Sequence, residues 1–275
     1  MHALSFLWDP SQGLDLGFFT LRYYSLMFVV AFVTGYILTK KIYKREGISM
    51  EKLDSLFIYV VIATLIGARL GHVIFYQSEL FKEDFLSVFL PIKTVPEFEF
   101  TGFQGLASHG ATIGIAIAMY YYSKKIMKKP LLWVLDKIVV GIAVGAIFVR
   151  IGNFINSEII GKATGTDYGV VFKKLGESFP RHPAQLYEAA GYVLVLIILW
   201  FVYWKTEKRK KQGYLFGLFF VLLWTIRFFV EYVKESQGGF ESQLGESLST
   251  GQWLSIPFIL IGLYFMFRPS KTITE

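Results

Sequence analysis

Apolar runs of about 20 residues, each followed by a polar or charged segment, recur along the chain, and a helix of that length spans a bilayer. The pattern predicts an all-α polytopic membrane protein, organised as one integral membrane domain over residues 1–275. We expect this domain to contain seven transmembrane helices. The predicted spans are residues 21–39, 56–76, 106–123, 131–150, 186–204, 214–232 and 253–267.

Lysine and arginine residues cluster after the first, third, fifth and seventh spans. Because these four positions face one side of the membrane, the positive-inside rule makes that side cytoplasmic. The N-terminus then lies outside and the C-terminus is cytoplasmic. Three further polar stretches are also outside: residues 77–105, which suit an interfacial helix and loop, residues 154–185, a small extracytoplasmic head segment, and residues 233–250.

Composition supports a membrane protein and narrows its chemistry. Hydrophobic residues make up 54% of the chain, and the net charge of +7 comes from clusters between apolar runs. Such clusters are typical of topology signals, so we expect no nucleic-acid partner. With no cysteine, the chain offers no thiol nucleophile, disulfide or cysteine-bound metal. Residues 1–17 lack the basic region of a cleavable signal peptide, and we expect no processing.

Several polar and ionisable residues of the predicted spans lie near their outer ends. A charge at the centre of a membrane helix costs about 2.5–3.5 kcal/mol and usually marks a functional site. Arginines outnumber carboxylates here, which predicts a cavity for an anion with an apolar body, such as a phospholipid head group from the outer leaflet. The residues at this depth are Tyr24, Arg69, His109, Arg150, Arg227 and Glu231. Asp136 is the exception, because it lies near the inner interface.

The segment from Arg150 to Glu158 combines a guanidinium with two amides. Arg150 and Asn153 share a helical face at this spacing, and Gly152 permits the close approach of a ligand or a second backbone. Asn156 adds the second amide. A planar guanidinium beside amide donors suits a phosphate group.

Two alternatives explain these charges without a ligand. An arginine at a helix end often extends its charged group to the membrane interface. The charges can also form internal ion pairs, for example Arg150 with Glu158 and Arg227 with Glu231. Neither alternative explains why three arginines, a histidine and a tyrosine gather at one depth.

His109 is the best-placed general base near neutral pH among the four histidines of the chain. It begins the third span, and Gly110 after it permits close approach of a ligand. An interfacial hydrogen-bond donor is the alternative role. No two histidines have ligand spacing and no carboxylate pair flanks His109, so we expect no metal.

Several motifs follow one another in a fixed order. Residues 149–158 read Val-Arg-Ile-Gly-Asn-Phe-Ile-Asn-Ser-Glu, and Arg227 to Glu231 read Arg-x-x-x-Glu. The other motifs are Arg-Tyr-Tyr-Ser-Leu-Met (22–27), Ala-Arg-Leu-Gly (68–71), Ser-His-Gly (108–110), Arg-His-Pro-Ala-Gln-Leu-Tyr-Glu (181–188) and Gly-Gln-Trp-Leu-Ser-Ile-Pro (251–257). With this set, covering nearly the whole chain, the sequence resembles the prolipoprotein diacylglyceryl transferases.

The resemblance implies an enzyme that uses phosphatidylglycerol and the signal peptide of a prolipoprotein with a lipobox cysteine. The cysteine thiol attacks the glycerol carbon that bears the phosphate, which forms a thioether and releases glycerol 1-phosphate. This is the first step of bacterial lipoprotein maturation. The implied location is the bacterial cytoplasmic (inner) membrane, as a multi-pass protein with its active site toward the outer leaflet. Both substrates are held in the lipid bilayer, and no cofactor is needed.

The resemblance and the depth of the charges together give a set of site residues. Arg150 and Arg227 would hold the negative charge that grows on the departing phosphate. Either His109 or the positive field of the arginines would help to remove the thiol proton. The catalytic candidates are Tyr24, His109, Arg150, Arg227 and Glu231. The candidates for binding phosphatidylglycerol are Arg69, Gly110, Arg150, Asn153, Asn156, Glu158 and Arg227.

The chain departs from the family pattern in three places. Val149 stands where the family often has glycine, and Leu223 stands where it often has tyrosine, with Trp224 beside it as a partial substitute. The loop before Arg181 is also shorter than in some relatives.

Three other functional classes compete with the transferase. A transporter or channel for an anionic solute would use the same arginine cluster but predicts polar residues at all depths, and often inverted repeats. An intramembrane hydrolase or protease predicts a Gly-x-Ser-x-Gly or paired-aspartate motif, which the sequence lacks. A receptor or scaffold with seven spans does not require the charge cluster.

Overall fold

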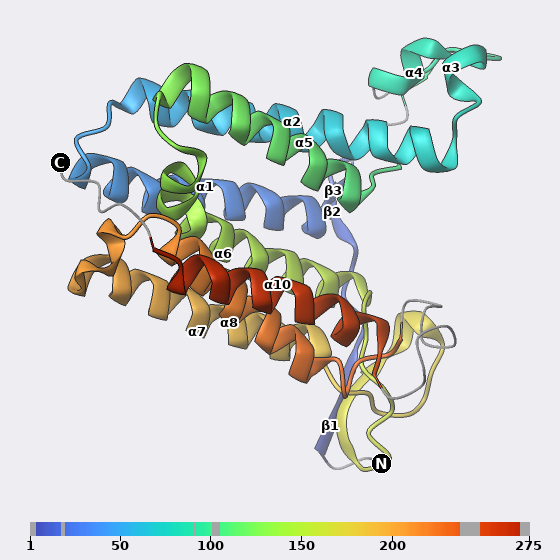
Figure 1. Ribbon diagram of the computed structural model, residues 1–275. Coiled ribbons are helices and arrows are strands. Elements are labelled where there is room, and N and C mark those ends of the chain that lie inside the picture. Colours follow the sequence, from blue (N-terminus) through green and yellow to red (C-terminus); the bar gives the residue numbers. More distant parts are fainter. Residues whose placement is uncertain (1–3, 18–19, 91, 101–104, 237–247, 270–275) are drawn as a thin grey trace. The chain divides into compact units, whose positions relative to one another are not determined.

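The computed structural model describes residues 4–17, 20–90, 92–100, 105–236 and 248–269 (Figure 1). The chain divides into two compact units. The first comprises Met1–Lys41 and Leu135–Glu275, and the second comprises Ile42–Val134. Long helices make up most of both units.

The first unit consists mainly of long helices, and each runs antiparallel to the long helix that precedes it in the unit. These helices are α1 (Tyr23–Arg45), α6 (Leu131–Asn156), α7 (Ala184–Lys205), α8 (Tyr214–Val230) and α10 (Thr250–Phe267), of which α1 and α6 continue into the second unit. Helices α8 and α10 pack along each other (Figure 1). Gly217 and Gly262 make this possible, because a Cβ on Gly217 would lie 2.5 Å from the Gly262 carbonyl oxygen. Small residues allow such close contact between helices in a membrane.

The head segment gains a strand from the N-terminus of the chain. Strand β1 (Leu4–Trp8) pairs in parallel with β6 (Tyr168–Phe172), in register from Leu4 with Tyr168 to Trp8 with Phe172. The Trp8 indole Nε1 donates to the Phe154 carbonyl oxygen (3.0 Å), and the two rings stack with centroids 4.5 Å apart. Phe154, Val170 and Phe172 form a buried cluster beneath the sheet. The sequence analysis did not predict this pairing.

Short elements complete the first unit. Strands β2 (Gly13–Asp15) and β3 (Thr20–Arg22) form an antiparallel hairpin that leads into α1. The 3-10 helix η2 (Lys173–Leu175) follows β6, and the 3-10 helix η3 (Glu207–Lys210) lies between α7 and α8. In the segment after α8, the Val233 carbonyl accepts a hydrogen bond from the backbone amide of Lys162 (2.8 Å). This bond joins the segment after α8 to the head segment.

The second unit is centred on two helices, α2 (Met50–Tyr76) and α5 (Ser108–Tyr121), which pack closely. Helix α5 continues as a π-helix, η1 (Tyr122–Met127). Between α2 and α5 lie the short helices α3 (Leu80–Glu83) and α4 (Phe85–Phe89) and the hairpin of β4 (Ile92–Lys93) with β5 (Glu99–Phe100). Within residues 77–90 and 92–100, these elements confirm short helical structure and add the hairpin. The interfacial position of this segment stays a prediction.

The helices confirm a polytopic membrane protein. Within the described residues, α1, α2, α6, α7 and α10 are long and apolar enough to cross a bilayer, and α8 is a shorter apolar helix of 17 residues. The predicted third span corresponds to α5, which has 14 residues before the six-residue π-helix begins. The prediction of seven spans and their orientation stays a prediction.

The described residues also depart from a purely α-helical fold, because they contain three two-stranded sheets. All three are made of strands of two to five residues in the segments that connect or precede the long helices. Strands this short carry too few alternating residues to be recognised by periodicity, and contacts made by the folded chain decide their pairing.

Candidate active site

Arg150 lies inside α6 and not at its end. The predicted span ended at Arg150, whereas the helix continues to Asn156. The residue is buried, with 8% of its surface exposed, and its guanidinium forms an ion pair with Glu188 of α7. Its Nη1 donates to the Asn153 Oδ1 (3.1 Å), which confirms that the two residues share a helical face. An arginine held in this way does not extend to the interface, and its carboxylate partner is Glu188 instead of Glu158.

The end of α6 folds back so that Glu158 meets the two amides of the motif. Ser157 has a positive φ of 58°, and the Glu158 backbone amide donates to the Asn153 carbonyl (2.9 Å). The Asn153 Nδ2 then donates to one oxygen of the Glu158 carboxylate (3.4 Å), and the Asn156 Nδ2 donates to the other (3.2 Å). Gln185 of α7 is fully buried and donates to the Glu158 carbonyl (2.6 Å). The motif therefore forms one hydrogen-bonded network.

Gly152 permits a close approach, but the approaching group is the side chain of Tyr24 of α1 and not a ligand or a second backbone. A Cβ on Gly152 would lie 2.8 Å from the Tyr24 ring. The Tyr24 hydroxyl hydrogen-bonds the Asn153 side chain and lies near Arg150 and Glu158. The structure thus brings together five predicted residues from α1, from α6 and from the segment after α6: Tyr24, Arg150, Asn153, Asn156 and Glu158.

A tyrosine of α7 connects Arg150 and Arg227, the two candidate site arginines of the first unit. Tyr192 is buried, hydrogen-bonds the Arg150 side chain and lies within electrostatic range of Arg227. Arg227 lies near the C-terminal end of α8, and its guanidinium sits over the Trp224 ring at 4.9 Å from the centroid. Trp224 itself stacks on Phe258 of α10 with centroids 4.2 Å apart. Trp224 therefore supports Arg227 with its ring.

Arg227 and Glu231 do not form the ion pair that was considered from the sequence. Glu231 instead accepts a hydrogen bond from the Lys234 Nζ (3.1 Å), and both side chains are buried. The Arg227 Nε is a buried donor without a hydrogen-bond partner within the described part of the chain. A buried donor of this kind loses its bonds to water without replacing them, so it favours an incoming anion.

The remaining candidates belong to the second unit. The Arg69 Nη2 donates to the Ser87 carbonyl (2.5 Å), which anchors α4 to α2. Gly110 lies against the backbone of α2, where its Cβ would be 2.7 Å from the Gly71 Cα, so its close approach is to a helix. His109 is exposed at the start of α5. The Ala107 amide donates to the Ala68 carbonyl (2.9 Å), which places Arg69 and His109 at the same end of the α2–α5 pair.

Asp136 is buried within the protein, with 2% of its surface exposed. Its predicted position near the inner interface stays a prediction. Its carboxylate accepts hydrogen bonds from the backbone amides of Gly213 (2.5 Å) and Phe216 (2.9 Å). These amides belong to the first turn of α8 and its preceding residue, which have no partner within the helix. Asp136 therefore caps α8 from a neighbouring helix and is not part of the site.

Arg181 organises the head segment. Its guanidinium donates to the Glu177 carboxylate (2.5 and 2.6 Å), to the Gly161 carbonyl and to Glu235. The hydrogen bonds to Glu177 raise the pKa of Arg181. Because Arg181 joins residues before and after α7 and α8, it holds the loops that border the candidate site. Across the described residues, no group of three or more histidine or carboxylate side chains could hold a metal ion.

Comparison with known proteins assigns the chain to a family. Residues 12–268 match the family model described as prolipoprotein diacylglyceryl transferase. The chain belongs to this family. It is 41% identical to the phosphatidylglycerol–prolipoprotein diacylglyceryl transferase of Bacteroides fragilis over 98% of this chain and 96% of the relative. It is 39% identical to the enzyme of that name from Tolumonas auensis, over 94% of this chain and 95% of the relative. The corresponding enzyme of Chloroherpeton thalassium is 36% identical, over 96% and 94%.

Glu188 is the first of three residues at the candidate site that sequence reasoning missed. It lies in the motif of residues 181–188 and is fully buried beside Arg150. One signal could have found it, because a carboxylate inside an apolar run near the outer end of a span usually has a partner. Tyr192 and Lys234 were missed as well, since neither stands in a motif that the sequence analysis used.

Proposed function

We propose that this protein transfers the diacylglyceryl group of phosphatidylglycerol to the thiol of a prolipoprotein lipobox cysteine. The relatives that match nearly the whole chain are named for phosphatidylglycerol and prolipoprotein, and this observation carries the proposal. The family membership is also what separates a transferase from a transporter built on the same arginines.

In the proposed reaction, the cysteine sulfur attacks the glycerol carbon that bears the phosphate. A carbon–sulfur bond forms while the carbon–oxygen bond to the phosphate breaks, and the electron pair goes to the phosphate oxygen. The products are the thioether and glycerol 1-phosphate, and the thiol proton passes to a base. Because negative charge grows on the departing phosphate, fixed cations near it stabilise the transition state.

The two candidate site arginines of the first unit suit different parts of this task. Arg150 is fixed in place by Glu188 and Asn153. A guanidinium held in one geometry gives directional hydrogen bonds to phosphate oxygens. Arg227 has its buried Nε donor available and lies over the Trp224 ring. We assign Arg150 to orienting the lipid phosphate and Arg227 to holding the charge as the phosphate leaves.

Amides and carboxylates complete the proposed site. Asn153, Asn156 and Glu158 form one network at the end of α6 and would bind the polar part of the lipid. Tyr24 closes this network from α1. Glu231 is held by Lys234 beyond the end of α8, within the same unit.

Two routes remain for removing the thiol proton. His109 is exposed at the start of α5, as a general base that meets a substrate would be. The alternative is that the field of the arginines favours the thiolate directly. We propose His109 as the base. The lipid-binding roles expected of Arg69 and Gly110 stay predictions, because both residues make structural contacts within the second unit.

The membrane arrangement belongs to the same proposal. We propose that α5 and α8 cross the bilayer together with the five longer helices, which makes seven spans in one integral membrane domain. The N-terminus and the head segment then face outward and the C-terminus is cytoplasmic. This places the first-unit network toward the outer leaflet of the bacterial inner membrane, where lipid and signal peptide enter laterally and proximity supplies much of the rate.

The test is diacylglyceryl transfer in vesicles that contain phosphatidylglycerol and a lipobox peptide, with thioether product and released glycerol phosphate both measured. Wild type should form both products in equal amounts, and Arg150→Ala and Arg227→Ala should form neither. Arg268→Ala is the matched control and should keep activity. Arg268 also lies over an aromatic ring, that of Phe265 at 5.4 Å from the centroid, but it follows the C-terminal end of α10, away from the candidate site. An inactive wild type, or a fully active Arg150→Ala variant, contradicts the proposal.

A further inference from the structure

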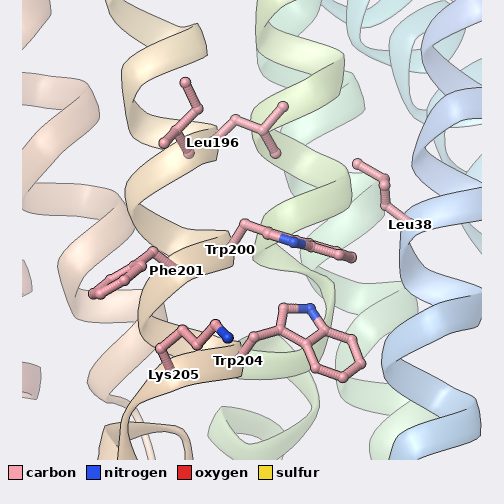
Figure 2. A pocket seen from close by; sticks show the side chains of 7 residues that line it. Leu38, Leu196, Trp200, Phe201, Trp204 and Lys205 are labelled. Atoms are coloured by element: carbon pink, nitrogen blue, oxygen red, sulfur yellow. The ribbon is translucent and has the colours of Figure 1, made fainter.

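A groove of about 440 Å³ lies between α1 and α7, at the end of the first unit away from the head segment. Figure 2 shows Trp200 and Trp204 projecting from α7 toward Leu38 of α1. The groove is lined by Leu38, Leu196, Ile197, Trp200, Phe201, Trp204 and Lys205. Its size lies within the range of about 300–1,000 Å³ that is typical of ligand sites.

Positive charge is concentrated at this apolar groove. Lys205 lines it, and the Lys41 Nζ lies 5.9 Å from the centre of the Trp200 ring. Both lysines are exposed, so their ammonium groups are available to a ligand. The tryptophan rings tilt against each other with centroids 5.4 Å apart. Tryptophan and lysine at a helix end are typical of the depth at which lipid head groups lie.

The groove and the candidate site are far apart within the unit. Glu188 and Lys205 lie near opposite ends of α7, which is about 25 Å at the usual helical rise. A lipid that occupies the groove is therefore a different molecule from the lipid substrate near Arg150. The orientation proposed above places the groove in the cytoplasmic leaflet.

We propose that this groove binds one anionic phospholipid of the cytoplasmic leaflet. One acyl chain lies between Leu38 and the two tryptophans, and the phosphate pairs with Lys41 and Lys205. The charge of the groove selects the ligand, because each lysine near an anionic surface strengthens binding severalfold. The bound lipid links α1, which carries Tyr24, to α7, which carries Glu188.

Fluorescence quenching tests the proposal without measuring transfer. The full chain is placed in phosphatidylcholine vesicles that contain a small fraction of brominated phosphatidylserine or brominated phosphatidylcholine with identical chains. Bromine quenches tryptophan fluorescence on contact, and Trp200 and Trp204 report on the groove. Phosphatidylserine carries the anionic charge without being the substrate named for the relatives.

In wild type, we expect brominated phosphatidylserine to quench at a mole fraction roughly tenfold lower than brominated phosphatidylcholine, from two lysine contacts. The double variant Lys41→Gln/Lys205→Gln should quench equally with both lipids and keep its transfer activity. Lys210→Gln is the matched control, because Lys210 pairs with Glu207 on the same loop and does not line the groove. It should keep the tenfold difference.

Three results overturn the proposal. Equal quenching of the wild type by both lipids removes the charge selectivity. Loss of the difference in Lys210→Gln shows a general effect of surface charge. Absence of quenching by either lipid at Trp200 and Trp204, judged against Trp200→Phe/Trp204→Phe, shows that protein covers the groove. None of these results depends on whether the protein transfers diacylglyceryl groups, so the two proposals are tested separately.

Discussion

In the first unit, Arg150 is buried against Glu188, Asn153 and Tyr192, groups from two helices. In the second unit, Arg69 is half-buried and donates to a backbone carbonyl of α4. Both arginines stand in predicted membrane helices and looked equivalent in the sequence. The first is the centre of a polar network, whereas the second secures a short helix to a long one.

The difference shows that the depth of a charge in a membrane helix does not by itself define its role. A buried ion pair is costly to desolvate and replaceable by apolar residues, so its presence in α6 and α7 points to function. Arg69 and Gly110 satisfy local structural needs that exist with or without a substrate. We therefore expect substitutions in the first-unit network to act on transfer, and those in the second unit to act first on stability, except at His109.

The largest effect on stability should follow Glu188→Gln. Removing one partner of a buried ion pair leaves an uncompensated charge and costs about 3–5 kcal/mol of stability. Since Arg150 also loses its fixed position, transfer should fall at least about tenfold in the protein that remains folded. Glu207→Gln is the control, because the Lys210–Glu207 pair is exposed and should be worth about 0–1 kcal/mol. The measurements are chemical unfolding and a transfer assay. Equal losses of stability and of transfer in the two variants would contradict the role of Glu188 in holding Arg150.

His109→Gln should separate catalysis from stability within the second unit. His109 is exposed, so unfolding should change by less than about 0.5 kcal/mol. If it is the general base, transfer should fall about 10²–10⁴-fold. His72→Gln on α2 is the control and should keep activity. A fall of less than tenfold in His109→Gln would favour activation of the thiol by the arginines.

Gly110→Ala should act mainly through packing. The added methyl group meets the α2 backbone at Gly67 and Gly71, so α5 must move, at a cost of about 1–3 kcal/mol. Gly145→Ala is the control, because a Cβ there has no atom within 4 Å and should not destabilise the protein. Thermal unfolding measures the stability of both variants. An unchanged midpoint with lost lipid binding would instead support the substrate-binding role of Gly110.

Asp136→Ala sharpens the comparison within the first unit, because this carboxylate is buried outside the network. Losing the cap of α8 should cost about 0.5–2 kcal/mol. Asp136→Asn, which keeps an acceptor, should recover most of the stability. Transfer per folded molecule should stay unchanged in both variants, and a loss of transfer at full stability would place Asp136 in the site.

The smallest effect concerns pH and the segment between α2 and α5. Hydrogen bonds from Ser87 and Thr94 lower the pKa of Asp84, whose ordinary value is about 3.9. A carboxyl with a lowered pKa stabilises the fold fully above its ordinary pKa, and this contribution is lost as the pH falls below about 4. Asp84→Asn should therefore lower the unfolding midpoint at pH 7, and lower it less at pH 3. An equal decrease at both values would contradict this role.

Much of the site was predictable because it depends on residue type and local spacing. Arg150 and Asn153 lie three residues apart in a helix, so their contact follows from helical geometry. Glu188 could not be paired with Arg150 in the same way, because the two lie on helices separated by a whole extracytoplasmic segment. The rotation of α7 about its axis decides that contact, and a uniformly apolar helix gives no periodic signal for its rotation.

The sequence by itself determined the helical membrane architecture and the family, and it supplied most of the candidate residues of the site. Hydrophobic length, charge clusters and motif order are properties of short segments and survive without a fold. Only the tertiary structure decided that Glu188 neutralises Arg150, that Asp136 caps α8, that Gly110 faces α2 and that residues 4–8 complete the head segment. Each of these contacts joins segments distant in the chain, and packing selects one partner among several that are chemically equivalent.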